Sequence, residues 1–220
     1  MSGVRAVLFD LDGTLLDTKD EWVRAFNEAL ASVGRPPLPA DAVAARIGTP
    51  FETILASIGV GPDDGARVTA TFVRLEHEAI RRGVRAFPGI REMLDGLRDR
   101  PLATVTNKAT DSAREALRVA GLEDRFRAIV GGDATPRKKP APDPMLRAAE
   151  VLQVPPDACL VVGDTENDVR AGRAAGARTV GVTWGYGSRR ALEEARAHFL
   201  IEAPAALPPL VRALTPNTGP

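Results

Sequence analysis

The chain has 220 residues, of which 44% are hydrophobic and 26% charged, as in an ordinary soluble globular protein. Its 29 basic and 29 acidic residues cancel to a net charge of zero, which argues against nucleic acid or an anionic membrane as the main partner. No apolar run approaches the ~18 residues of a membrane span, and the sequence shows no signal peptide, so we expect a cytoplasmic protein. The single cysteine, Cys159, excludes an intramolecular disulfide.

The first predicted element is a buried strand over residues 4–9, an apolar run that ends in acidic residues. Asp10 and Asp12 are two positions apart, so an extended backbone directs both carboxylates to the same side. Gly13 then allows the chain to turn sharply away. Two carboxylates at the end of a buried strand are costly unless a cation lies between them. The alternative is a strand that simply ends in a solvated acidic turn.

The rest of the chain divides into two patterns. Residues 18–85 show helical periodicity only, with helices predicted at about 19–33, 41–47, 51–58 and 63–82. From about residue 86 onward helices and strands alternate, which is typical of a parallel α/β sheet. The predicted strands there are 102–106, 128–131, 158–163, 178–182 and 199–201, and the predicted helices are 90–98, 111–120, 144–152, 168–175, 188–195 and 205–214.

These patterns predict an α/β fold with a doubly wound, Rossmann-like parallel sheet. Residues 1–17 and 86–214 would form this core. Residues 18–85 would form a small all-helical domain inserted after the first strand. Residues 215–220 are expected to be a disordered tail.

Three further predicted strands end in polar residues. Thr106 is followed by Asn107 and Lys108, a Lys138-Lys139-Pro140 loop follows the next strand, and Asp164 and Asp168 follow the one after that. In doubly wound sheets, ligands bind outside the carboxyl ends of the strands. The sequence therefore predicts that all four polar clusters, including Asp10 and Asp12, meet at one edge of the sheet.

The order and spacing of these clusters resemble the four signature motifs of the haloacid dehalogenase superfamily. The motifs are the run Phe-Asp-Leu-Asp-Gly-Thr-Leu at 9–15, Thr106, the Lys139-Pro140 pair and Gly163-Asp164 with Asp168. The resemblance extends along nearly the whole chain and includes the segments 87–89, 131–133 and 183–187. It is greatest to the phosphoglycolate phosphatase branch, whose cap domain the helical insertion matches.

The resemblance implies a phosphatase that uses Mg²⁺ and acts on a small phosphorylated metabolite, phosphoglycolate being the leading candidate. Asp10 would be the nucleophile that forms an aspartyl phosphate, and Asp12 the general acid and then base. Thr106 and Lys139 would hold the phosphoryl oxygens. Mg²⁺ would bind Asp10, the backbone carbonyl of Asp12 and Asp164.

Other residues receive supporting roles by the same resemblance. Asp168 would orient Lys139 or a metal-bound water, and Lys138 would be a solvated neighbour. The candidate substrate contacts are Asn107, Lys108, Arg46 and Thr49, the last two from the turn 46–51 of the cap. Each also has a purely structural interpretation: Asp164 and Asp168, for example, suit the first turn of a helix.

Several functions stay open. Pyrophosphatase, nucleotidase and sugar-phosphate phosphatase or mutase activities occur in the same superfamily. A member of a different class, a phosphoacceptor or interaction module without turnover, would also combine acids, a threonine and a lysine around Mg²⁺. Asp12 argues against dehalogenation, because the dehalogenases lack this second aspartate. The sequence is compatible with a monomer or a homodimer.

Overall fold

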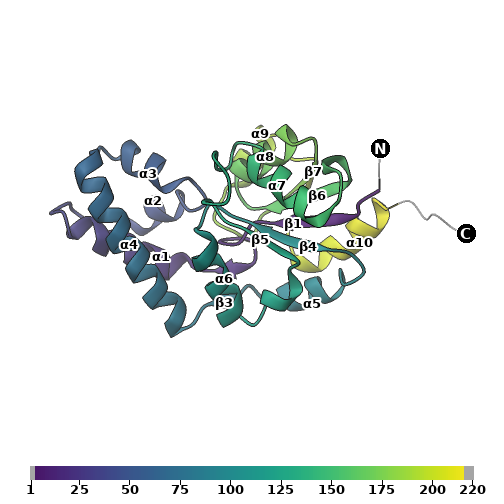
Figure 1. The fold of residues 1–220 in the computed structure, drawn as a ribbon, viewed down its shortest axis with the longest axis horizontal. Helices are drawn as coiled ribbons and strands as arrows, with labels where there is room; N and C mark the ends of the chain where they lie inside the picture. The colour runs from purple at the N-terminus through teal and green to yellow at the C-terminus, as the bar shows by residue number, and fades with distance from the viewer. Residues whose placement is uncertain (1–2, 216–220) are drawn as a thin grey trace, which may run out of the picture.

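The computed structural model describes residues 3–215, which form a six-stranded sheet with helices on both faces and a group of helices at one end (Figure 1). The strand order is β5-β4-β1-β6-β7-β8, and every pairing is parallel. The strands are β1 Ala6–Phe9, β4 Leu102–Val105, β5 Ala128–Val130, β6 Cys159–Gly163, β7 Arg178–Val182 and β8 Phe199–Ile201. Because the chain extends the sheet on one side of β1 and then returns to its other side, the carboxyl end of β1 lies at the switch point of the sheet.

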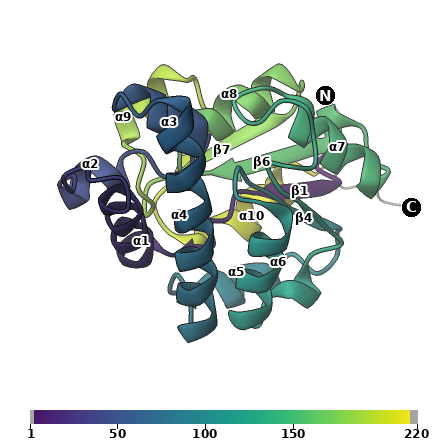
Figure 2. The same cartoon turned by 60° about the vertical axis from the view of Figure 1, so that its left-hand side comes forward.

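Alternate residues of each strand face opposite layers of helices, as the pleat requires. In β1, Val7 and Phe9 pack with α5, α6 and α10, whereas Ala6 and Leu8 pack with α7 and α8. Figure 2 shows these two layers on either side of the sheet. The helices are α5 Ile90–Asp95, α6 Thr110–Val119, α7 Asp143–Leu152, α8 Glu166–Ala174, α9 Arg189–Glu194 and α10 Leu207–Ala213, and the short 3₁₀ helices are η1 Glu123–Arg125, η2 Pro156–Ala158 and η3 Pro204–Ala206. We call the sheet with these helices the core.

The helices at the end of the molecule form a separate hydrophobic cluster, and we call residues 19–82 the helical module. Its helices are α1 Lys19–Ala31, α2 Ala40–Ala44, α3 Phe51–Ser57 and α4 Pro62–Arg82. Aromatic rings fill its centre: the ring centroid of Phe72 lies 4.7 Å from that of Trp22 and 4.6 Å from that of Phe51. Such aromatic pairs contribute more than their buried area alone.

The chain enters and leaves the helical module through a two-stranded antiparallel ribbon that the sequence did not predict. Strand β2 (Leu16–Asp17) pairs with β3 (Arg85–Ala86). Strands of two residues carry no readable alternation, which is why they were missed.

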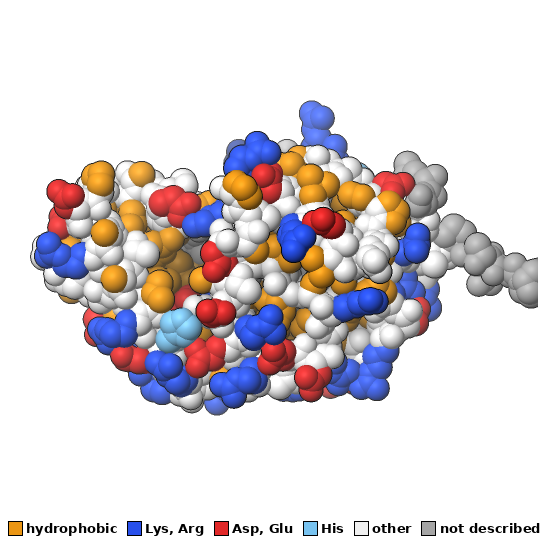
Figure 3. All heavy atoms as spheres, viewed as in Figure 1, with side chains coloured by type: hydrophobic (Ala, Val, Ile, Leu, Met, Phe, Trp, Pro, Cys, Tyr) orange, Lys and Arg blue, Asp and Glu red, His pale blue; other side chains and the backbone are white. Residues whose placement is uncertain are grey.

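The predicted order of the larger elements is correct, and the differences lie at their ends. Helix α5 ends at Asp95 rather than at residue 98, and the last predicted helix begins as the 3₁₀ helix η3 before α10. Residues 216–220 of the expected tail lie outside the described residues. Between residues 3 and 215, no helix is long and apolar enough to cross a membrane. On the face shown in Figure 3, acidic and basic side chains are interspersed, and neither forms an extended patch.

Candidate active site

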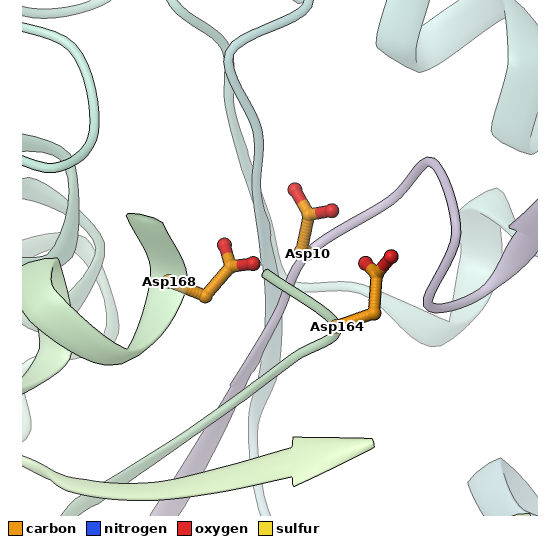
Figure 4. A group of neighbouring side chains, drawn as sticks. All are labelled: Asp10, Asp164 and Asp168. Carbon is orange, nitrogen blue, oxygen red and sulfur yellow. The ribbon is translucent and has the colours of Figure 1, made fainter. Parts of the chain in front are cut away.

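Three buried carboxylates come together at the carboxyl ends of β1 and β6. Asp10 follows β1, Asp164 follows β6, and Asp168 lies in the first turn of α8; Figure 4 shows the three side chains converging. One carboxylate oxygen from each lies within 4.8 Å of the others. The structure thus brings together the first and last of the predicted polar clusters.

Lys139 compensates part of this negative charge. Its Nζ lies 2.5 Å from Asp10 Oδ1 and 2.6 Å from Asp168 Oδ1, and it donates a third hydrogen bond to the Val105 carbonyl at 2.9 Å. An ammonium has three donors, so all of them are used and the side chain is fixed. Burial alone lowers the pKa of Lys139, but the charges of the two aspartates raise it above its usual value. The lysine therefore stays charged inside the protein.

Asp10 has one oxygen held and one oxygen free of protein contacts. Its Oδ1 accepts from Lys139, whereas its Oδ2 is buried without a hydrogen-bond partner among the described residues. Burial raises the pKa of Asp10 well above its ordinary value; Lys139 opposes this shift, and the charges of Asp168 and Asp164 add to it. A buried carboxylate oxygen without a partner, beside a second acid, is where a cation would be stabilised.

Asp164 is held by a tight backbone cradle. Its Oδ1 accepts from the Thr14 hydroxyl at 2.9 Å, and its Oδ2 accepts from the backbone N–H of Tyr186 at 2.8 Å. A Cβ on Gly13 would lie 2.4 Å from Asp164 Oδ2, and a Cβ on Gly185 would lie 2.4 Å from Asp164 Cβ, so neither position has room for a side chain. Burial, and then the charge of Asp168, raise the pKa of Asp164 to about 6.

Asp168 supports the lysine and the start of its own helix. Its Oδ1 contacts Lys139, while its Oδ2 accepts from the Thr165 backbone N–H at 3.1 Å and from the Thr165 hydroxyl at 2.7 Å. The bond to the Thr165 N–H, together with the bond from the Asp168 backbone N–H to the Thr165 side chain, forms a capping box. The side chain therefore combines the expected contact to Lys139 with the helix-capping role that was its structural alternative.

Asp12 lies in a second group of charges, to which the helical module contributes. Asp12 Oδ1 accepts from the Thr18 hydroxyl at 2.8 Å, and its Oδ2 lies 3.3 Å from Lys108 Nζ. Lys108 Nζ also lies 2.5 Å from Oε1 of Glu76 on α4. Burial lowers the pKa of Lys108, but Asp12 and Glu76 together raise it above its usual value.

Sequence analysis missed Glu76, although a signal for it exists. Phe72, Glu76 and Ile80 follow one another at four-residue spacing on α4, so Glu76 is an acid within the apolar stripe of this helix. An acid at such a position must be paired when it is buried. Its partner, Lys108, lies 32 positions further along the chain and is not readable from local pattern.

A cavity of about 190 Å³ lies between the helical module and the ends of the strands. The predicted residues Asp10, Asp12, Thr106, Asn107, Lys108 and Thr49 all line it, as does Lys138. The other lining residues are Trp22, Ile47, Gly48, Phe51, Thr69, Phe72, Val73, Glu76 and Ala109.

Two predicted residues, Lys139 and Arg46, lie differently from expectation. Lys139 was expected to hold phosphoryl oxygens, but all three of its donors are used on protein oxygens. Arg46 is not among the residues that line the cavity, and its guanidinium donates to the Ala42 carbonyl of its own helical segment. Lys138, expected to be a solvated neighbour, is partly exposed, and its Nζ lies 2.9 Å from Oε2 of Glu52 on α3.

Asn107 connects the turn 46–51 to the loop that carries Lys139. Its Nδ2 donates to the Gly48 carbonyl at 2.9 Å and to the Lys139 carbonyl at 3.1 Å, and its Oδ1 accepts from the Lys139 backbone N–H at 3.0 Å. Asn167 donates to the same Gly48 carbonyl at 3.3 Å. The amide of Asn107 is thus occupied by backbone groups, which makes it a positioning residue of the loop and the turn.

Known proteins resemble this chain along most of its length. Residues 7–182 match the profile of the family described as haloacid dehalogenase-like hydrolase. A phosphoglycolate phosphatase of Nitrosospira multiformis is 36% identical over 219 residues, which cover 96% of this chain and 94% of that protein. A solved structure of a predicted phosphoglycolate phosphatase from Haemophilus somnus has a TM-score of 0.84 at 26% identity, covering 96% of this chain and 99% of that chain. A hydrolase from Pseudomonas syringae has a TM-score of 0.85 at 28% identity, with coverages of 97% and 100%.

Proposed function

We propose that this chain, which belongs to the haloacid dehalogenase-like hydrolases, is a Mg²⁺-dependent phosphatase that acts on a small phosphate monoester. The observation that carries the proposal is the arrangement around Asp10. One of its oxygens is held by Lys139, the other is buried without a hydrogen-bond partner among residues 3–215, and both Asp10 and Asp12 line the cavity.

The donor set at the strand ends suits Mg²⁺. Asp10 and Asp164 offer hard carboxylate oxygens, which this ion prefers, and the backbone carbonyl of Asp12 would add a third oxygen. When bound, the ion would neutralise charge on the phosphate and polarise a phosphoryl oxygen.

The side chains of the protein supply the remaining chemistry. The Asp10 carboxylate attacks phosphorus, the bond from phosphorus to the ester oxygen breaks, and Asp12 gives its proton to the departing alkoxide. The product of this step is an aspartyl phosphate on Asp10. Asp12 then takes a proton from the water that hydrolyses this phosphate, which restores both residues.

Two neighbours hold these two carboxylates, and a third would contact the substrate. Lys139 uses all three donors on protein oxygens, so it counters the charge of Asp10 and fixes its direction. The Thr18 hydroxyl holds one oxygen of Asp12. Thr106, at the end of β4, lines the cavity and would donate its hydroxyl to a phosphoryl oxygen.

The helical module would act as a cap over the leaving group. The cavity of about 190 Å³ is smaller than the roughly 300–1,000 Å³ of sites for drug-sized ligands, which favours a small metabolite. Phosphoglycolate is the leading substrate, because relatives with that name align with nearly the whole chain.

Turnover measurements on the full chain test this proposal. We expect steady, Mg²⁺-dependent hydrolysis of p-nitrophenyl phosphate, abolished by EDTA, and faster hydrolysis of phosphoglycolate than of pyrophosphate, nucleoside monophosphates or sugar phosphates. Stoichiometric phosphorylation of Asp10 without turnover would instead identify a phosphoacceptor. Faster hydrolysis of another panel member would replace phosphoglycolate as the substrate.

A further inference from the structure

An ion pair between the core and the helical module has no task in the chemistry proposed above. Lys108, which follows β4, pairs with Glu76 of α4 at 2.5 Å, and its Nζ lies 3.3 Å from Asp12 Oδ2. The side chains are nearly closed to solvent, with exposed fractions of 5% for Lys108 and 11% for Glu76. General acid and base catalysis by Asp12 requires no second carboxylate on this lysine.

Lys108 is the cation best placed to meet an anionic leaving group. Among the residues lining the cavity only Lys108 and Lys138 are basic, and Lys138 pairs with Glu52, whose side chain is 65% exposed. Lys108 contacts Asp12, the residue that would protonate the ester oxygen. In a phosphorylated 2-hydroxy acid a single carbon separates the ester oxygen from the carboxylate, so that carboxylate would arrive beside Lys108.

Glu76 and such a carboxylate compete for the same ammonium. Two carboxylates in addition to Asp12 around one buried lysine would repel one another strongly. Asp12 is fixed at the end of β1 by the Thr18 hydroxyl. Among the described residues, the side-chain hydrogen bond that holds Glu76 to the core is the one to Lys108, and Glu76 reaches the cavity from α4. Glu76 is therefore the carboxylate that gives way.

We propose that Glu76 is a specificity-determining residue, whose carboxylate occupies on Lys108 the place that the distal carboxylate of the substrate takes. This inference rests on the proposed phosphatase function and narrows it to monoesters of small 2-hydroxy acids. A neutral leaving group leaves Glu76 on Lys108 and must share the cavity with it, whereas an anionic leaving group displaces it.

Two substrates that differ in this carboxylate test the inference. Phosphoglycolate is compared with 2-hydroxyethyl phosphate, which has an alcohol in place of the carboxylate. Glu76→Gln removes the competing charge and should lower KM for phosphoglycolate at least threefold, with KM for 2-hydroxyethyl phosphate changed less than twofold. Lys108→Gln should reduce the ratio of kcat/KM for phosphoglycolate over 2-hydroxyethyl phosphate at least tenfold; any effect through Asp12 is common to both substrates and cancels.

Glu52→Gln is the matched control, because Glu52 is the module carboxylate that pairs with the other lysine of the cavity. It should leave the substrate ratio unchanged. A higher KM for phosphoglycolate in Glu76→Gln, or an unchanged ratio in Lys108→Gln, overturns the inference while hydrolysis of both esters upholds the phosphatase function. If wild type hydrolyses neither ester, the phosphatase function itself fails.

A measurement on the wild type covers the case in which a variant does not fold. Glycolate should inhibit hydrolysis of p-nitrophenyl phosphate competitively, and ethylene glycol at the same concentration should not. Equal inhibition by both compounds, or by neither, also overturns the inference.

Discussion

Two buried lysines, in two regions of the site, each compensate the charge of buried carboxylates, but their partners come from different parts of the molecule. Lys139 lies in the sheet-edge cluster, with Asp10, Asp168 and Asp164, and Lys108 lies in the boundary cluster, with Asp12 and Glu76. Each ammonium contacts two carboxylates. All partners of Lys139 belong to the core, whereas one partner of Lys108 belongs to the helical module. The charge balance around Asp10, the proposed nucleophile, is therefore independent of the module, whereas the balance around Asp12, the proposed acid and base, is not.

His77, the residue next to Glu76, also contacts the core. His77 Nδ1 lies 2.5 Å from Oε2 of Glu115 on α6, and its Nε2 lies 3.0 Å from the Ser112 hydroxyl. The hydrogen bond from His77 is the largest of the effects that lower the pKa of Glu115. Two consecutive residues of α4 thus attach the module to the core through side chains alone. The sheet-edge cluster, by contrast, is built from strand ends and backbone groups.

The largest effect should come from Asp10, the proposed nucleophile of the sheet-edge cluster. Asp10→Asn should lower kcat at least ~10³-fold on every substrate, because an amide cannot form the aspartyl phosphate. Steady-state assays with phosphoglycolate and p-nitrophenyl phosphate measure this, with mass spectrometry to exclude deamidation back to Asp. Activity within tenfold of wild type would remove Asp10 from this role. A loss of kcat that differed between the two substrates would mean that the sheet-edge cluster, like the boundary cluster, responds to the leaving group.

The two adjacent lysines of the loop after β5 should differ greatly. Lys139→Ala should lower kcat/KM by about 10²–10³-fold, because it leaves Asp10 and Asp168 uncompensated, whereas Lys138→Ala should stay within about threefold of wild type. Lys139→Arg should also be poor, since a planar guanidinium cannot reproduce the three bonds of the ammonium. Kinetics on protein whose folding is checked by circular dichroism measures these effects, and equal losses at both lysines would contradict the assignment.

The raised pKa of Asp164 gives the sheet-edge cluster a pH signature. Between the ordinary value of 3.8 and about 6, the folded protein without metal holds a proton on Asp164 that the unfolded chain has lost. The free energy of unfolding should therefore fall as pH rises through this window. Asp164→Asn removes this effect. The free energy of unfolding of the variant, relative to that of wild type, should therefore rise by up to roughly 3 kcal/mol between pH 4 and 7, at about 1.36 kcal/mol per pKa unit.

Urea unfolding in EDTA at several pH values between 4 and 7.5 measures this difference, and parallel curves for the two proteins would contradict it. Added Mg²⁺ should flatten the curve of wild type, because the ion binds the charged carboxylate.

The smallest effect should come from the boundary. Ser112→Ala removes the hydroxyl that bonds His77 across the two parts, and should cost about 1 kcal/mol of stability, as for a single neutral hydrogen bond. Ser57→Ala is the matched control, because its hydroxyl bonds only the Ile54 carbonyl within α3. Urea unfolding measures both. A loss of stability above about 3 kcal/mol in Ser112→Ala would mean that contacts at the boundary contribute as much to stability as those of the sheet-edge cluster.

The sequence predicted the positions of side chains that directly follow a buried strand. It did not predict contacts that depend on how a helix of the module packs against the core. The residues at the ends of β1, β4 and β6 were predicted to converge because parallel strands share one edge. The contact between Glu76 and Lys108 depends on how α4 packs against the core, which no local pattern encodes. The same limit applies to Arg46: the turn 46–51 does reach the cavity through Gly48 and Thr49, but the rotation of the preceding segment directs Arg46 elsewhere.

The central place of β1 in the sheet has a consequence for synthesis on the ribosome. Ala6–Phe9 is made before both of its neighbours: β4 ends at Val105 and β6 at Gly163, and both follow the whole helical module. Both edges of this apolar strand stay unpaired until β4 is made, and one edge stays unpaired until β6 is made; an unpaired edge is a template for aggregation. The helices of residues 19–82 can pack around their aromatic rings during this interval. We therefore expect the first strand to need protection, by a chaperone or by transient contacts, until β6 has been made.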